Sequence, residues 1–222
     1  MRTRRRRIQL LPLTSVLLPY QAMPLHIFEP RYAKLLSNSI AKDEPFGIVL
    51  IRFGDEVGDP DVVPHWVGTL ARIVACKPTR DGEYHAIAMG EERFQIFEVE
   101  RDGDTLVASV EPLEEEGWRN SSENFALLSR ARAALKEHLQ VVFGHQDMAL
   151  DVDIDREPAA LSFAIAGCLG LEPLQRQRLI EVTDTAHRLA SLIPLLEEKT
   201  ELMHSVSPRA SDELYAEYLS RN

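Results

Sequence analysis

Cysteine, glycine-rich loops and positive charge are all scarce in this 222-residue sequence, and each shortage excludes a class of protein. The sequence holds two cysteines, Cys76 and Cys168, and no CxxC pair. A disulfide scaffold needs more cysteines than this, and a structural zinc site needs closely spaced pairs. We therefore expect a cytoplasmic protein in which both cysteines are small buried hydrophobic residues.

Patterns that carry catalysis are also missing. No glycine is followed by lysine, so the phosphate-binding loop GxxxxGK[ST] is absent, and so are GxSxG, HExxH and GxGxxG. The densest acidic cluster, Asp151, Asp153 and Asp155, begins like a calcium-binding loop. Arg156 stands where such a loop needs glycine, and Ser162 stands where it needs glutamate. We predict a solvated loop there, and we expect no enzymatic activity, no cofactor and no metal.

Positive charge is scarce outside the first residues. The chain has 25 lysines and arginines against 35 aspartates and glutamates, a net charge of -10, and five of the arginines lie within residues 1–7. The other 215 residues carry 20 bases and 35 acids, a net charge of -15. Such a body repels phosphate backbones, so nucleic-acid binding is not favoured. We expect residues 1–7 to form a disordered basic terminus.

One long uncharged stretch, Ile8–Phe28, follows the arginines and raises the question of a membrane anchor or signal peptide. Pro12, Pro19 and Pro24 each cost about 3 kcal/mol inside a helix, and no small-residue cleavage site follows. We therefore expect neither a membrane span nor export.

Residues 8–115 consist of short runs rich in β-branched and aromatic residues, separated by turn residues, which predicts a compact β-rich domain. The expected strands are Ile8–Leu13, Met23–Ile27, Phe46–Arg52, Trp66–Lys77, Tyr84–Met89, Phe94–Glu100 and Thr105–Val110. One helix is expected at Pro30–Ala41, and its buried face should carry Tyr32, Leu35, Leu36 and Ile40.

Two Asp-Gly pairs, Asp81-Gly82 and Asp102-Gly103, mark hairpins between neighbouring strands. Pro78 refines the first hairpin, because proline cannot donate a ladder hydrogen bond. We predict a three-residue loop with a bulge, Arg80–Gly82, with Gly82 in the left-handed conformation and a sheet edge at Pro78.

From residue 116 to 205 the hydrophobic period changes to that of helices, which predicts a helical subdomain, and residues 206–222 should be a flexible tail. The expected helices begin at Asn120–Ser122 and end at Gly144, centre on Leu161–Leu169, span Glu172–Val182 and span Asp184–Met203. The first should bury Phe125, Leu128, Leu135, Leu139 and Val142, and the last Leu189, Leu192, Ile193 and Leu196.

The most distinctive segments are Leu10–Leu13, Met23–Tyr32, Pro45–Leu50, Val67–Val74, Gly90–Phe94 and Val107–Leu113. In order and spacing they resemble the LON substrate-binding domain, the amino-terminal domain of Lon-type ATP-dependent proteases. The resemblance implies an α+β fold, in which an N-terminal PUA-like β pseudo-barrel with one helix is followed by a C-terminal α-helical bundle. The AAA+ motor and the Ser-Lys protease domain of those proteases are not expected in this chain, so we expect a stand-alone module without catalytic residues.

The resemblance also implies a role in binding polypeptide. Expected partners are unfolded or degron-like segments, with a separate protease or chaperone as a further partner. An alternative is RNA binding, because PUA-like folds often bind RNA. A basic patch on the folded body would support that alternative.

Candidate residues for polypeptide binding lie on the segment from His26 to Tyr32 and on nearby aromatic residues: His26, Phe28, Glu29, Arg31, Tyr32, Phe46 and Trp66. A structural role is the alternative for most of them. The three aromatic residues Phe28, Tyr32 and Phe46 suit the core, His26 suits a packing position, and Glu29 with Arg31 suits a helix cap and an ion pair. Trp66 is the candidate most expected to be partly exposed.

Overall fold

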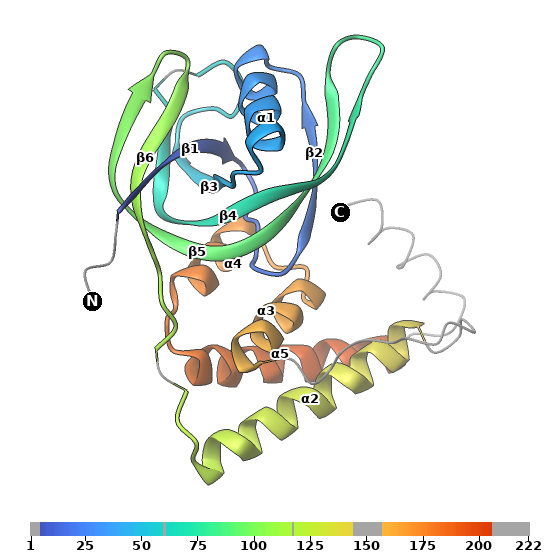
Figure 1. The fold of residues 1–222 in the computed structure, drawn as a ribbon. Coiled ribbons are helices and arrows are strands. Elements are labelled where there is room, and N and C mark those ends of the chain that lie inside the picture. Colours follow the sequence, from blue (N-terminus) through green and yellow to red (C-terminus); the bar gives the residue numbers. More distant parts are fainter. Residues whose placement is uncertain (1–4, 60, 117, 144–156, 206–222) are drawn as a thin grey trace. The chain divides into compact units, whose positions relative to one another are not determined.

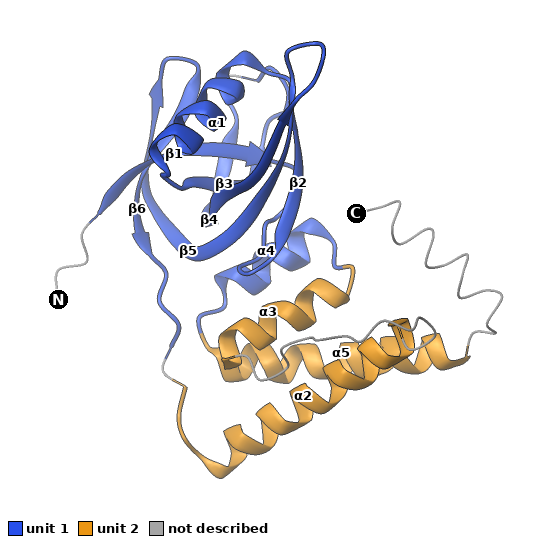
Figure 2. Ribbon diagram, turned by 45° about the vertical axis from the view of Figure 1, so that its right-hand side comes forward, with its two compact units in different colours: residues 1–116, 171–183 blue, residues 117–170, 184–222 orange. Residues whose placement is uncertain are grey.

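A computed structural model of the chain describes residues 5–59, 61–116, 118–143 and 157–205. The chain forms two compact units. Residues 1–116 and 171–183 make a β unit, and residues 117–170 and 184–222 make a helical unit (Figure 2). A single boundary near residue 115 was expected, with residues 171–183 in the helical half, whereas the structure groups these residues with the β unit. The predicted tail at 206–222 and the acidic loop at Asp151–Asp155 lie outside the described residues.

The β unit is built on one mixed sheet. Its strands are β1 (Arg6–Leu13), β2 (Ala22–Ile27), β3 (Phe46–Phe53), β4 (Val63–Pro78), β5 (Tyr84–Asp102) and β6 (Thr105–Pro112). They follow the order β2-β5-β4-β3-β1-β6, and β5 also pairs with β6 (Figure 1). Five strands therefore close into a ring, and β2 joins β5 outside that ring. This closed curl is the pseudo-barrel that the sequence implied, and it has no free edge where β5 meets β6.

Neighbouring residues of the central strands face two different core clusters. Leu10 of β1 lies in one cluster and Leu11 lies in the other. The same alternation separates Ile48 from Val49 on β3. Strands that are buried on both faces have continuous hydrophobic runs rather than alternating ones, which explains the uncharged runs in this part of the sequence.

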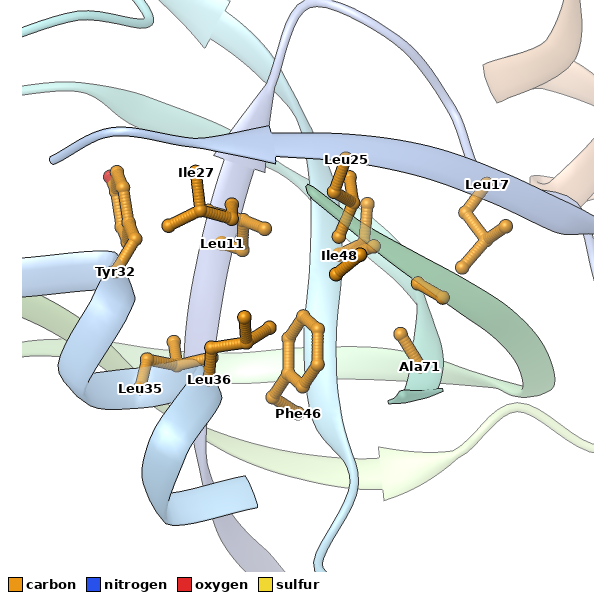
Figure 3. Packing of buried hydrophobic residues seen from close by; sticks show 12 residues of the cluster. Leu11, Leu17, Leu25, Ile27, Tyr32, Leu35, Leu36, Phe46, Ile48 and Ala71 are labelled. Carbon is orange, nitrogen blue, oxygen red and sulfur yellow. The ribbon is translucent and has the colours of Figure 1, made fainter. Parts of the chain in front are cut away.

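Helix α1 (Pro30–Lys42) covers one of these clusters (Figure 3). Its buried residues are Tyr32, Leu35, Leu36 and Ser39. Ile40, which was expected on the buried face, is 49% exposed. The contact stripe follows i, i+3, i+4 and i+7 from Tyr32, so it reaches Ser39, and Ile40 lies one step further round the helix.

Strand β5 is one 19-residue strand, although the sequence suggested two strands separated by residues 90–93. Gly90 stays in the ladder and allows the loop before β2 to approach closely. A Cβ atom at Gly90 would lie 2.3 Å from the carbonyl oxygen of Leu18. The nitrogen of Tyr20 donates to the oxygen of Gly90 at 2.9 Å, and the nitrogen of Gly90 donates to the oxygen of Gln21 at 2.9 Å. The glycine therefore marks a close backbone approach and not a strand end.

The hairpin between β4 and β5 has the predicted three-residue loop. The nitrogen of Thr79 donates to the oxygen of Glu83 at 2.8 Å, which leaves residues 80–82 in the loop, and Gly82 has φ of +83°. The predicted edge at Pro78 is also confirmed. In the described sheet, β4 pairs with β3 as far as Ala71, and beyond this point it pairs with β5 alone.

A buried arginine holds helix α4 (Pro173–Glu181) to the sheet. The Arg93 side chain is 3% exposed, and its Nη1 donates to the carbonyl oxygens of Ile180 and Val182 at 2.7 Å each. Its Nη2 donates to the carboxylate of Glu115 at 2.6 Å. A cation at the C-terminus of a helix satisfies carbonyl groups that have no partner within the helix. This explains why residues 171–183 belong to the β unit.

The helical unit contains α2 (Ser122–Phe143), α3 (Pro158–Cys168) and α5 (Thr185–Ser205). The hydroxyl of Ser121 accepts from the nitrogen of Asn124 at 3.2 Å, so one of the three expected cap residues caps α2. The four residues expected in the core of α5 are all buried, at 0–1% exposure. On α2, however, Phe125 is 54% exposed, and the buried face consists of Leu128, Ala131, Ala134, Leu135 and His138.

Two further expectations are corrected. Cys76 is exposed and Cys168 is partly buried, so neither is the fully buried residue that we expected. The basic start is also more ordered than expected, because β1 begins at Arg6 and pairs with β6. Arg6 and Arg7 pair with residues of β6 through the backbone, and their side chains lie next to acidic residues that are distant in sequence. The sequence alone does not show these partners.

Candidate functional site

A groove lies on the exposed face of the β unit where β2, β5 and β4 run side by side. Its volume is about 620 Å³, which is within the range of ligand-binding pockets. The register places Pro24 of β2 and Ala75 of β4 on either side of Ile87 of β5. Ile87 is 42% exposed, and the next residues along the strands, Leu25 and Ala86, point into the core. The groove therefore has an apolar floor on a firmly packed sheet.

Two histidines and an aromatic ring border this floor. His26 and His85 are directly opposite each other on β2 and β5, and their rings stack with centroids 4.8 Å apart. The ring of Phe28 lies 5.7 Å from that of His26, and Phe28 is 47% exposed. The Nε2 atom of His26 lies 2.6 Å from a carboxylate oxygen of Glu83, which fixes the ring. His26 therefore lies in an exposed aromatic row and not in the packing position that was its alternative.

The groove also carries an ammonium group. Lys77 pairs with His85 across β4 and β5 and lines the groove. No ion pair of Lys77 is found in the part of the chain that the structure describes. The carboxylate of Glu83 is bonded to His26. Lys77 therefore supplies a positive charge at the groove, although the whole chain carries a net charge of -10.

Both free sheet edges next to the groove are interrupted. Pro24 lies in the middle of β2 and lacks the N–H group that a further strand would need. The β4 edge has a register shift between Ile73 and Ala75 and ends at Pro78. Prolines and bulges are the features that keep sheet edges from pairing with other chains. Recognition by side chains in the groove is therefore favoured over addition of a strand.

Four of the seven candidate residues have structural roles. Tyr32 and Phe46 are 6% and 2% exposed and lie in the core cluster under α1 (Figure 3). Such burial leaves them no surface for a ligand and raises the pKa of the Tyr32 hydroxyl. Glu29 and Arg31 form the expected ion pair, at 2.8 Å, and both are largely buried. Glu29 precedes α1, but its side chain forms no cap hydrogen bond, so the expected cap is not present.

Trp66 of β4 is 48% exposed, in agreement with its predicted partial exposure, but it does not line the groove. The candidates that the structure brings together are His26 and Phe28. The sequence analysis missed Ile87, Lys77 and His85 as companions of these two residues. The Asp-Gly signal at residues 81–82 pairs β4 with β5, and it could have placed Lys77 opposite His85.

The arginines at the start of the chain are paired with acids. Arg5 lies 3.1 Å from Glu111, Arg7 lies 3.4 Å from Glu100, and Arg6 pairs with Glu92. These pairs neutralise the described part of the basic block, so it offers no basic patch for a phosphate backbone.

No group of three or more histidine, cysteine, aspartate or glutamate residues within the described ranges is arranged to hold a metal ion. None of the described helices combines the length and apolar character that a membrane span requires.

This fold, a closed β barrel joined to a helical unit, is that of the Lon N-terminal domain. The chain matches a Lon N-terminal domain protein from Xanthomonas campestris with a TM-score of 0.62 and 26% identity, over 85% of this chain and 98% of that one. It also matches the N-terminal domain of Lon protease from the Mycobacterium avium complex with a TM-score of 0.66 and 20% identity, over 86% of this chain and 98% of that one. The second likeness concerns the fold alone.

Comparison of the sequence with known families identifies the family of this chain. The model of the ATP-dependent protease La (LON) substrate-binding domain matches residues 7–198, so the chain belongs to that family. The Lon protease of Phenylobacterium zucineum is 27% identical over 206 residues, and that of Paraburkholderia phytofirmans is 28% identical over 198 residues. These matches cover 90% and 87% of this chain but 25% and 24% of the two proteases. The chain thus spans about a quarter of the length of these relatives.

Proposed function

We propose that this protein is a non-catalytic module that binds unfolded or degron-like polypeptide segments in the groove between β2, β5 and β4. Membership of the LON substrate-binding family supports a role in substrate recognition. The observation that carries the choice of site is the exposed apolar floor around Ile87, bordered by the aromatic row of Phe28, His26 and His85.

The chemistry of the groove fits an unfolded chain better than a folded one. An unfolded segment exposes side chains such as leucine and phenylalanine, and burying one of them gains about 2 kcal/mol. Ile87, Pro24 and Ala75 provide the apolar surface for such a side chain. A folded partner keeps these side chains in its own core. We therefore expect binding to depend on the unfolding of the partner.

RNA binding remains the alternative function, and the observations favour it less. The described arginines Arg5, Arg6 and Arg7 each have an acidic partner. Lys77 alone supplies a fixed positive charge in the groove, and one cation gives little attraction to a nucleic-acid backbone.

Fluorescence anisotropy tests the proposal, with labelled reduced and carboxymethylated α-lactalbumin as the unfolded probe. The same protein in its native, disulfide-bonded form is the control for unfolding, and a labelled single-stranded RNA is the control for the alternative. We expect the unfolded probe to bind and the other two not to bind. Binding of RNA alone would contradict the proposal.

A pair of matched variants tests the site. Ile87→Asp places a charge on the floor of the groove, and Val63→Asp makes the same kind of change on β4 outside the groove. The two side chains are β-branched and are 42% and 43% exposed, so the two changes should affect folding alike. We expect Ile87→Asp to weaken binding about tenfold or more. Equal weakening by both variants would show that the groove is not the site.

Alkylation of a thiol introduced at Ala75 locates the bound segment independently, because Ala75 is exposed and lines the groove opposite Ile87. In an Ala75→Cys variant that also carries Cys76→Ala and Cys168→Ala, saturating amounts of the unfolded probe should slow the reaction of the introduced thiol with a maleimide. An unchanged rate at saturation would place the binding elsewhere.

A further inference from the structure

The groove combines an apolar floor with a positive charge at a fixed distance along the sheet, and this combination defines a class of segment. Ala75 lies opposite Ile87, and Lys77 lies opposite His85. Lys77 is therefore two residues further along β4 than the apolar floor. Two residues of extended chain span about 7 Å, and their side chains point to the same face.

The groove has one side chain with a fixed positive charge, Lys77 of β4. The imidazole rings of His26 on β2 and His85 on β5 lie on the adjacent strands. Glu83, in the turn before β5, is the acid that faces them, and its carboxylate is bonded to His26. Because Glu83 is bonded to His26, the Lys77 ammonium is available for an anion from outside. An extended segment lying along β4 would bring such an anion to it.

Resting on the proposed function, we infer that the groove selects extended segments in which a large apolar or aromatic side chain and a carboxylate lie two residues apart. The apolar side chain lies over Ile87 and Ala75, beside the ring of His26. The carboxylate meets the Lys77 ammonium at the rim. The volume of about 620 Å³ accommodates a phenylalanine side chain together with its neighbours.

The net charge of the chain and the charge of Lys77 act on an acidic segment in opposite directions. The whole chain carries a net charge of -10, so its average field repels an acidic segment. A preference for acidic segments would therefore have to arise locally, at Lys77. Salt weakens both effects, but it acts less on a contact within a few ångströms than on the average field.

Three labelled peptides test this inference. They are short, and they carry a phenylalanine with glutamate, glutamine or lysine two residues away on both sides, so that either chain direction can be bound; their other positions are uncharged. We expect the glutamate peptide to bind about threefold to tenfold more tightly than the lysine peptide, with the glutamine peptide between them. The Lys77→Glu variant should reverse this order. Lys34→Glu, on an exposed position of α1, is the control, and it should leave the order unchanged.

The outcomes separate the inference from the proposed function. If the three peptides bind equally and Ile87→Asp weakens all of them, the groove binds polypeptide without charge selection, and the inference is wrong while the proposed function stands. If Lys34→Glu changes the order as much as Lys77→Glu does, the average field and not the rim selects, which also overturns the inference. If neither the peptides nor unfolded α-lactalbumin bind, the proposed function itself fails.

Discussion

Both units bury an arginine, Arg93 in the β unit and Arg188 in the helical unit, but among the described residues only the helical unit also buries a histidine. The β unit buries Arg93 as a cation and surrounds it with two carbonyl oxygens and the Glu115 carboxylate. The helical unit buries His138 as a neutral ring, and this burial, with the nearby Lys199 charge, lowers the pKa of His138 from 6.5 to about 4. Arginine stays protonated at all physiological pH values, whereas histidine does not. The β unit should therefore tolerate mild acid that destabilises the helical unit.

The hydrogen bonds of His138 show which tautomer is buried. The hydroxyl of Thr200 donates to the carbonyl oxygen of Leu196 at 2.7 Å, so its oxygen is free to accept from Nδ1 of His138 at 2.9 Å. A neutral ring with its proton on Nδ1 satisfies this arrangement. A second proton on the ring would introduce a charge into a site that is 3% exposed.

Each unit has its own fluorescent reporter. The sequence contains two tryptophans, Trp66 in the β unit and Trp118 in the helical unit. Replacing one of them with phenylalanine leaves a protein in which tryptophan fluorescence follows one unit during urea unfolding. The predictions below use these two reporter proteins.

The largest expected effect is the loss of Arg93. Arg93→Met leaves the carbonyl groups at the end of α4 and the Glu115 carboxylate without their donor, which we expect to cost about 3–5 kcal/mol of stability. This loss of stability should be seen when unfolding is followed by Trp66 fluorescence, and its size should not depend on pH between 5 and 8. Arg93→Lys keeps the charge but loses the fork of donors, so it should be intermediate. A loss under about 1 kcal/mol in Arg93→Met would contradict the role of Arg93.

Acid should destabilise the helical unit through His138. The folded-state pKa of about 4 lies below the usual value of 6.5, so between these values the unfolded chain binds more protons. Stability is full above pH 6.5, falls as the pH drops, and is reduced by about 3 kcal/mol at pH 4. The Trp118 signal should show this fall. His138→Gln, which keeps a donor for Thr200 but does not titrate, should show a smaller dependence on pH, and an equal dependence would exclude His138 as its source.

A smaller effect is expected from adding one methyl group in the β unit. A Cβ atom at Gly68 would lie 2.6 Å from the ring of Phe94 and 2.7 Å from the carbonyl oxygen of Ile48. Overpacking of this kind costs about 1–3 kcal/mol. Gly68→Ala should therefore lower the free energy of unfolding that is measured by Trp66 fluorescence. Gly82→Ala is the control for backbone strain alone, because Gly82 has φ of +83° but no atom within 4 Å of an added Cβ atom. Equal stability of Gly68→Ala and the parent would show that the ring of Phe94 moves freely.

The smallest effect is expected at the exposed arginines. The ion pairs of Arg7 with Glu100 and Asp102 are more than half exposed at each partner, so Arg7→Ala should cost less than about 1 kcal/mol. Raising the salt concentration should reduce this cost further. A larger loss of stability that persists at high salt would mean that the Arg7 side chain contributes through packing and not through its ion pairs.

Much of the fold could be predicted from the sequence, because local signals carry it. Proline at position 78 and glycine at position 82 determined the hairpin, and the period of 3.6 located the helices. The single strand β5 was predicted as two strands, Tyr84–Met89 and Phe94–Glu100, because the sequence does not show the close approach of the Leu18 carbonyl to Gly90. The grouping of residues 171–183 with the β unit depends on Arg93, whose partners are 87 and 89 residues away in sequence.

The groove could be predicted only in part. His26 and Phe28 were found because they lie in a distinctive segment, whereas Tyr32 and Phe46 from the same reasoning are core residues. Residue type does not show on which side of a helix or a sheet an aromatic residue lies. In the sheet that side depends on strand register, and register also brings Ile87 to the groove floor.

The central claim is that unfolded polypeptide binds on the apolar floor of this groove. The most direct test is the anisotropy titration of reduced and carboxymethylated α-lactalbumin against the parent protein, Ile87→Asp and Val63→Asp under the same conditions. We predict binding to the parent and to Val63→Asp, and at least about tenfold weaker binding to Ile87→Asp. Equal affinity of Ile87→Asp and the parent would contradict the claim.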